Sequence, residues 1–154
     1  MSEGRVEFIH VALSAGAPME ARAQVRLLAG SGIEGDRYAT QTGAFSSKPK
    51  SGRQITFIEA EAIEALSREL GLALGPGETR RNVVTRGVAL NHLVDCEFQV
   101  GSARFRGTEL CEPCKYLVGL TGKPEILPGL IHRGGLRAEI LEGGDLRVGD
   151  AVRV

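Results

Sequence analysis

The chain has 154 residues, 42% of them hydrophobic and 25% charged, which is typical of one soluble globular domain with a substantial core. Its 19 basic residues balance 19 acidic ones, so the strongly basic face of a nucleic-acid-binding protein is not expected. The start is polar and no apolar run reaches membrane-spanning length, so neither a secretory signal nor a membrane span is predicted. Three cysteines fit a reducing cytoplasm better than a secreted disulfide scaffold.

The first half of the chain is predicted to contain short strands, one long loop and one helix. Residues 6–13 and 23–28 are apolar enough to form two strands that pair with each other. Residues 39–54 are polar and without periodicity, and loops of this length are usually functional or mobile. A strand at 54–58 then leads into the clearest helix, 59–70, which ends at the natural C-cap Gly71. The side chains expected on its buried face are Ala60, Ile63, Leu66 and Leu70.

The second half alternates short apolar segments with glycine-rich turns. We expect, in chain order, a strand at 83–85, a helical turn within 88–94, a hairpin of 98–100 and 103–105, and strands at 136–141, 146–148 and 151–154. Tight turns among the 21 glycines indicate a β-barrel or sandwich with a helix or two. A closed barrel would pair the edges of so many short strands, so the expected fold is mainly β with short helices, of the α+β class.

The most informative segment holds two of the three cysteines, Cys111 and Cys114, three positions apart. Pro113 stiffens the chain directly before Cys114, and Lys115 follows it. If a helix begins here, Cys114 lies in its first turn, where unpaired N–H groups and the nearby positive charge favour the thiolate. A reactive or metal-ligating sulfur is therefore the leading hypothesis.

The cysteine pair also admits three other interpretations. A zinc site would need a second compact pair of ligands, and only Cys96 and His132 are available. A thioredoxin-type dithiol should follow a strand in a βαβ unit, which the surrounding pattern does not show. Two buried structural thiols remain a possible alternative, because free cysteine packs well in a core.

Two polar motifs also carry candidate ligand-binding residues. The turn at 32–38 contains Asp36 and Arg37, which could form an exposed ion pair or orient a ligand. Arg80-Arg81-Asn82 precedes a strand, and it is either a solvated basic turn or a phosphate-binding group. The histidines at 10, 92 and 132 are isolated in sequence and are not expected to be ligands.

Together these segments resemble a known family, the MOSC domain, which is named for the C-terminal domain of molybdenum cofactor sulfurases. The segments that carry the resemblance are residues 32–37, 53–54, 80–88, 111–114, 133–138 and 149–150, in this order, within about residues 20–154. The chain is expected to be a stand-alone, single-domain member spanning residues 1–154. We expect no pyridoxal phosphate site and no ferredoxin domain in it.

The resemblance implies a MOSC-type β-barrel, binding of the pterin-type molybdenum cofactor, and one essential cysteine that ligates molybdenum or carries sulfane sulfur. That cysteine follows proline in related domains, so it corresponds to Cys114. The cofactor phosphate would need arginine, backbone and hydroxyl donors. The residues expected to bind the cofactor are Arg37, Ser46, Ser47, Arg80, Arg81, Asn82 and the additional thiol Cys111. The loop 39–54 is expected to be mobile, to border this site and to become ordered on binding.

Three functions are compatible with these expectations. One is reduction of N-hydroxylated compounds, with a separate reductase supplying electrons, because the chain has no flavin, haem or iron–sulfur motif. The second is a carrier role, in which Cys114 holds sulfur, received for example from a cysteine desulfurase, or the cofactor. The third is a regulatory binding module without catalysis. Bound molybdenum would favour the reductase, and a persulfide would favour the carrier.

Overall fold

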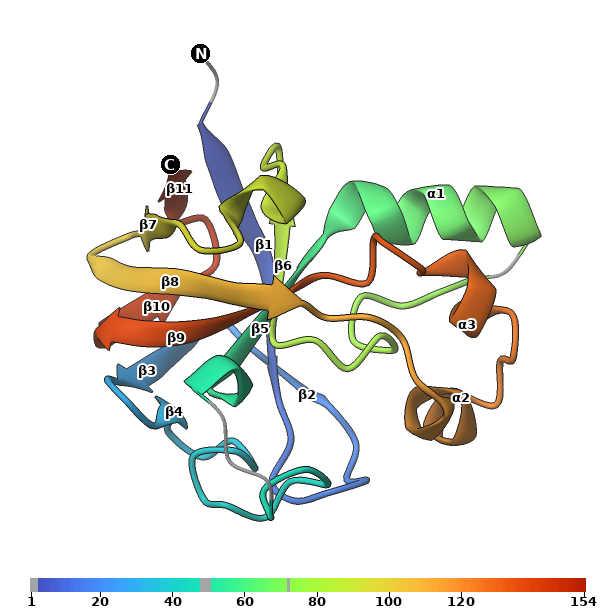
Figure 1. Cartoon of the computed structure of the whole chain (residues 1–154), viewed down its shortest axis with the longest axis horizontal. Coiled ribbons are helices and arrows are strands. Elements are labelled where there is room, and N and C mark those ends of the chain that lie inside the picture. Colours follow the sequence, from blue (N-terminus) through green and yellow to red (C-terminus); the bar gives the residue numbers. More distant parts are fainter. Residues whose placement is uncertain (1–2, 48–50, 72) are drawn as a thin grey trace.

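A closed barrel of seven strands forms the centre of the molecule, as seen in the computed structural model, which describes residues 3–47, 51–71 and 73–154 (Figure 1). The strands are ordered β11–β7–β8–β9–β5–β6–β1, and antiparallel pairing of β1 with β11 closes the ring. Their bounds are β1 Gly4–Val11, β5 Ile55–Glu59, β6 Val83–Arg86, β7 Glu97–Val100, β8 Ala103–Leu110, β9 Leu136–Glu142 and β11 Ala151–Arg153. The mainly β barrel with short helices is therefore confirmed.

A small second sheet lies beside the barrel and corrects one predicted pairing. The strand β3 (Gln24–Leu28) does not pair with β1; it lies between β10 (Gly144–Arg147) and β4 (Gly32–Ile33). The edge of β1 is occupied instead by β2 (Glu20–Arg22), which comes directly before β3. Alternate side chains of β3 are buried, so the strand contributes Val25 and Leu27 to the main core.

The core inside the barrel is built around three aromatic rings. Phe57, Phe98 and Phe105 have centroids 5.3–5.4 Å apart, in edge-to-face and stacked pairs. A second apolar cluster lies outside the barrel, where the helices cover it (Figure 1). These helices are α1 (Ala60–Leu70), α2 (Lys115–Thr121) and α3 (Ile126–Gly129). Leu66, Leu117 and Leu130 from the three helical segments meet in this cluster.

The local predictions for α1 and the hairpin agree with the structure. Helix α1 ends at Gly71, whose φ of 62° lets its N–H bond to the Ser67 carbonyl. Leu70 is the exception: it is 40% exposed, because the last turn extends beyond the second cluster. The hairpin pairs Val100 with Ala103 in β7 and β8.

Two short 3-10 helices complete the described elements, η1 (Ser51–Arg53) and η2 (Leu90–Leu93). The first lies within the predicted loop 39–54, and the second lies within the predicted turn at 88–94. The expected turn at 143–145 is shorter than predicted, because β10 already begins at Gly144. Of the helices in the described ranges, the longest has 11 residues, and none could cross a membrane.

Candidate functional site

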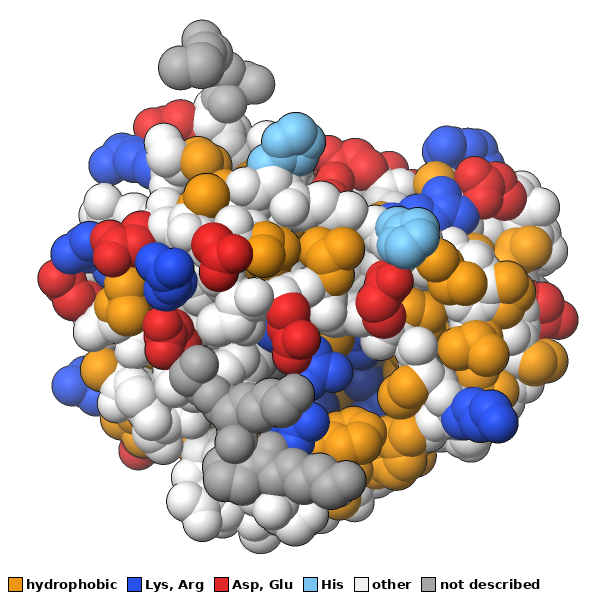
Figure 2. Space-filling view, in the orientation of Figure 1, with side chains coloured by type: hydrophobic (Ala, Val, Ile, Leu, Met, Phe, Trp, Pro, Cys, Tyr) orange, Lys and Arg blue, Asp and Glu red, His pale blue; other side chains and the backbone are white. Residues whose placement is uncertain are grey.

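A hollow lined by five arginines and two cysteines opens where the loop before β5, the segment before β6 and the start of α2 meet. Figure 2 shows basic side chains recessed at the centre of one face, with hydrophobic side chains beside them. The arginines are Arg37, Arg53, Arg80, Arg81 and Arg137, and the thiols are Cys111 and Cys114. Among the described lining residues the only carboxylate is that of Glu112. The hollow therefore has a strong excess of positive charge.

The two cysteines occupy different environments on this wall. Cys114 is half-buried and is the N-cap of α2, one position before the helix where it was expected, with extended φ and ψ of −139° and 169°. Cys111 is only 4% exposed, and its backbone is fixed on both sides. Its N–H donates to the Gly135 carbonyl at 2.7 Å, and its own carbonyl accepts from Arg81 at 2.9 Å. Both thiols are free, and Cys114 is the more accessible.

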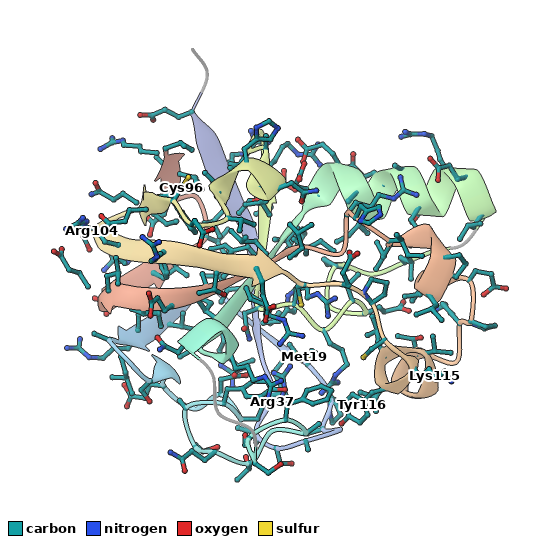
Figure 3. The ribbon with its side chains drawn as sticks, in the orientation of Figure 1. Met19, Arg37, Cys96, Arg104, Lys115 and Tyr116 are labelled. Atoms are coloured by element: carbon teal, nitrogen blue, oxygen red, sulfur yellow. The ribbon has the colours of Figure 1, made fainter. Side chains whose placement is uncertain are left out.

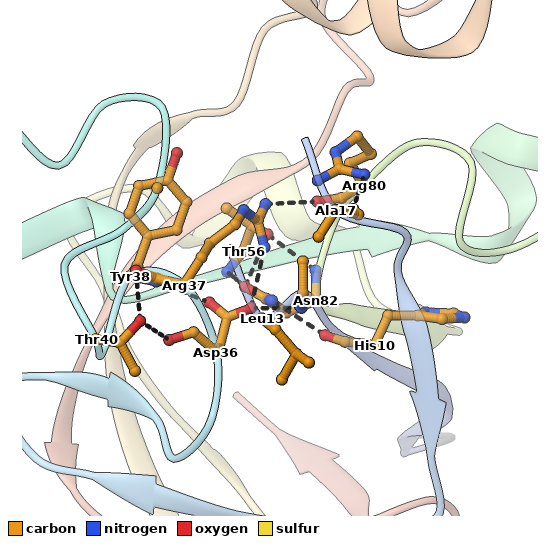
Figure 4. A network of polar contacts seen from close by, with 12 residues as sticks. His10, Leu13, Ala17, Asp36, Arg37, Tyr38, Thr40, Thr56, Arg80 and Asn82 are labelled. Carbon is orange, nitrogen blue, oxygen red and sulfur yellow. Dashed lines mark hydrogen bonds and ion pairs between the residues drawn. The ribbon is translucent and has the colours of Figure 1, made fainter. Parts of the chain in front are cut away.

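Arg37 is held by a buried network rather than by an exposed ion pair (Figure 4). Asp36 is fully buried, and its Oδ1 accepts from Arg37 Nη1 and from the Ala12 N–H, each at 3.0 Å. The guanidinium lies 4.9 Å from the Tyr38 ring centroid, and its Nη2 donates to the Arg80 carbonyl at 3.4 Å. Asp36 therefore positions Arg37 and ties the turn to β1.

Arg80 is the most unusual residue of the hollow. Its φ of 60° lies in the left-handed region, which a residue with a side chain rarely adopts, and such strain is often found at functional sites. Nη1 donates to the Ala17 carbonyl at 2.8 Å, whereas Nη2 is buried without a hydrogen-bond partner in the described structure. Burial lowers the pKa of the guanidinium, and the positive charge of Arg37 lowers it further. An anion placed here would satisfy Nη2 and relieve this repulsion.

Arg81 and Asn82 lie in the interior, not in a solvated turn. Arg81 is 8% exposed, and its guanidinium donates to three carbonyl oxygens, those of Gly134, Thr79 and Cys111, at 2.8, 3.2 and 2.9 Å. Asn82 is 2% exposed, accepts from the Thr56 N–H and hydroxyl, and donates to the His10 carbonyl. These bonds join the strand segments around the hollow.

The loop at 39–54 borders the hollow, as expected, although residues 48–50 lie outside the described ranges. The Phe45 ring packs edge-on against Tyr116 of α2, with centroids 6.0 Å apart, and Arg53 donates to the Phe45 carbonyl at 2.8 Å. Ser46 accepts the Gly43 N–H through its hydroxyl, and Ser47 is exposed. Neither serine lines the hollow. With the loop in this position the hollow has a volume of only about 70 Å³.

The zinc alternative finds no support in the described ranges, where no group of three or more potential metal-ligating side chains occurs. Cys96 is exposed near β7, away from Lys115 and Tyr116 in Figure 3. His132 pairs instead with Glu112, at 3.2 Å between Nδ1 and Oε2.

The lining residues that were not assigned to the site from sequence include Tyr38, Arg53, Tyr116 and Arg137. Arg53 and Arg137 belong to the segments that carry the family resemblance, and this was the available signal. The 3-10 helix η1 brings the segment of Arg53 to Arg137, where a Cβ at Gly52 would lie 3.4 Å from the Arg137 Cβ. Nothing in the local sequence around the two tyrosines indicated their position.

Comparison with known proteins identifies the family. A family model described as the MOSC domain matches residues 35–153. The chain belongs to the MOSC domain family. This family is linked to binding of the molybdenum cofactor and to sulfur handling. A search of curated proteins gave no match.

Solved structures share the MOSC barrel at low sequence identity. The YUAD protein from Bacillus subtilis is 16% identical, with a TM-score of 0.80, and the alignment covers 98% of this chain and 94% of that one. YiiM from Geobacillus stearothermophilus is 13% identical, with a TM-score of 0.74 and coverage of 97% and 74%. YiiM from Escherichia coli is 16% identical, with a TM-score of 0.69 and coverage of 99% and 69%. At these identities the likeness shows the fold alone.

Proposed function

We propose that this MOSC domain is a cytoplasmic protein that binds the molybdenum cofactor in the arginine-lined hollow and uses Cys114 as its reactive sulfur. The observation that carries the proposal is the meeting of an accessible thiol with five arginines and one carboxylate in the described lining. Soft thiolate is a ligand that suits molybdenum, and guanidinium groups suit a phosphate.

The donor set fits an anionic cofactor. Among the described residues Arg80 offers a buried nitrogen without a partner, and Arg37 presents a guanidinium whose direction Asp36 fixes. The one ion pair of Arg137 within the described ranges is loose, 4.0 Å from Glu109. By contrast, Arg81 and Asn82 have their hydrogen-bonding groups committed to the protein, so we propose that they shape the hollow rather than contact the phosphate.

The loop must move for the cofactor to enter. Pockets for ligands of this size usually measure about 300–1,000 Å³. The hollow of about 70 Å³ is smaller than this range. The contact between Phe45 and Tyr116 joins the loop to α2 at the hollow, and its separation would enlarge the opening. We propose that Ser46 and Ser47, which lie on this loop outside the lining, serve as additional donors once the loop has become ordered around the cofactor.

We further propose that the protein, once it holds the molybdenum cofactor, reduces N-hydroxylated compounds. The cofactor would supply the redox chemistry, and a separate reductase would supply the electrons. The role of the chain is to bind the cofactor through Cys114 and the arginines and to exclude bulk water from the hollow. A sulfur- or cofactor-carrier role is the second candidate, favoured by the partial exposure of Cys114, which a desulfurase could reach.

The test is the molybdenum and pterin content of protein purified from a host that makes the cofactor. The wild type and Cys96→Ser should carry both, because Cys96 lies outside the hollow. Cys114→Ser should lose most of the molybdenum. Mass spectrometry of the same samples separates the two candidates, since a carrier of sulfur should show a persulfide on Cys114. Absence of both molybdenum and persulfide from the wild type would contradict the proposal and leave the regulatory module.

A further inference from the structure

A second hollow, which we call the His10 groove, adjoins the cysteine hollow across Arg80. It has a volume of about 570 Å³ and is formed by the connection between β1 and β2, the connection between α1 and β6, and the end of α2. Arg80 is the one residue that lines both hollows in the described structure. This volume lies within the usual range of about 300–1,000 Å³ for small-molecule sites.

The walls of the His10 groove are largely apolar. Pro18, Met19, Pro76 and Leu120 line it, and Met19 lies on the same side of the barrel as Arg37 in Figure 3. A flexible thioether beside two proline rings forms a surface that accommodates flat apolar groups. A strongly hydrated ligand would gain little here, because these side chains cannot replace its hydration.

Two of the four polar side chains in the groove, Glu78 and Thr121, are fully engaged by the protein. The carboxylate of Glu78 pairs with Lys123 and accepts the Gly75 N–H at 3.1 Å. The Thr121 hydroxyl donates to the Val118 carbonyl and accepts the Lys123 N–H. Two groups remain without partners in the described structure, His10 Nδ1 and Arg80 Nη2.

His10 is placed to recognise an uncharged polar ring. It is 5% exposed, and burial lowers its pKa below the ordinary value of 6.5, so the imidazole is neutral at pH 7 and has one donor and one acceptor. Gly77 packs closely against one edge of the imidazole, where a Cβ would lie 3.0 Å from Cδ2 and 3.1 Å from Nε2. A side chain at this position would therefore press on the ring and shift it.

From these observations we propose that the His10 groove binds a planar, uncharged heteroaromatic ring, with His10 and Arg80 as its hydrogen-bonding residues. A cation is disfavoured by Arg80, and an anion finds more arginines in the neighbouring hollow. The ring could belong to a substrate or to the pterin of the cofactor, since Arg80 joins the two sites. Both sources share the same chemistry, and the experiment below separates them.

In the test, cofactor-free protein is titrated separately with adenine and with 6-hydroxymethylpterin, and calorimetry measures the binding. At least one of these probes should bind to the wild type. His10→Phe keeps an aromatic ring but removes both nitrogens, and Gly77→Ala places a methyl group against the imidazole and displaces it. Each variant should weaken binding by at least about tenfold. Cys96→Ser, at a residue that lines neither hollow, is the matched control and should bind the probe like the wild type, and thermal unfolding confirms that each variant is folded.

Repeating the titration with cofactor-loaded protein shows whether the ring that binds in the groove belongs to a substrate or to the pterin of the cofactor. Retained binding supports the groove as a substrate site, whereas lost binding supports it as the pterin site. The proposal is overturned if neither probe binds to cofactor-free protein, or if both groove variants bind as tightly as the wild type. Because these titrations need no molybdenum, their failure is distinguishable from failure of cofactor loading in the test of the proposed function.

Discussion

Replacing Arg81 with alanine should destabilise the protein strongly, although a second arginine stands next to it. The guanidinium of Arg81 is the donor for three carbonyl oxygens, and the side chain is buried. A hydrogen bond to a charged group contributes about 1.5–3 kcal/mol, and a buried acceptor left without a donor costs about 1–3 kcal/mol. Because water can enter the space and the losses are not additive, we expect a net loss of about 3–5 kcal/mol.

Arg80→Ala is the matched control for this experiment. In the described structure the Arg80 side chain makes one hydrogen bond, to the Ala17 carbonyl, and alanine meets the same backbone strain at a φ of 60°. A loss of only about 1 kcal/mol is expected. The assay is urea unfolding of cofactor-free protein followed by circular dichroism, together with thermal unfolding, in which Arg81→Ala should lower Tm by roughly 6–20 °C. Equal losses for the two variants, or a loss below about 1 kcal/mol for Arg81→Ala, would refute the structural role of Arg81.

Three further predictions concern the thiols, the loop and pH. Alkylation of the folded protein should slow far more in Cys114→Ser than in Cys111→Ser, because Cys111 is 4% exposed; equal rates would contradict this order. Phe45→Ala removes the ring contact with Tyr116 and should speed cofactor uptake measured by stopped flow, so an unchanged rate would exclude this contact as the barrier. Burial lowers the pKa of His10 in the folded protein, so as the pH falls the unfolded state binds a proton at this residue before the folded state does. The free energy of unfolding should therefore be highest above pH 6.5 and should fall as the pH drops from 6.5 toward the folded-state pKa. Urea midpoints at pH 7.5 and 5.5 should therefore differ less in His10→Phe than in the wild type, and an equal difference would show that other groups dominate.

Local sequence patterns were sufficient to predict helix α1 and the β7–β8 hairpin. Helix α1 has an apolar face and a glycine at its end, and the β7–β8 hairpin has alternating side chains around Gly101, whose φ is 57°. The strand that pairs with β3 could not be predicted from local sequence. Its neighbour β10 lies more than a hundred residues further along the chain, so the pairing depends on closure of the whole barrel.

The same distinction applies to the site. Proline and lysine beside Cys114 are local signals, and the structure places this cysteine on the wall of the hollow. Arg80 and Arg81 have the same side chain and adjacent positions. Yet Arg80 has a nitrogen at the hollow without a partner in the part of the chain that the structure describes, whereas Arg81 is bonded into the interior. Their different roles depend on the carbonyl groups of distant segments, such as Gly134, which no local pattern specifies.

A crystal structure of cofactor-loaded protein, with anomalous data collected at the molybdenum absorption edge, tests directly whether Cys114 binds molybdenum. We expect a single molybdenum peak in the arginine-lined hollow, within bonding distance of the Cys114 sulfur, and loss of that peak in Cys114→Ser. A molybdenum peak outside this hollow, or one in the hollow that persists unchanged in Cys114→Ser, would contradict this expectation.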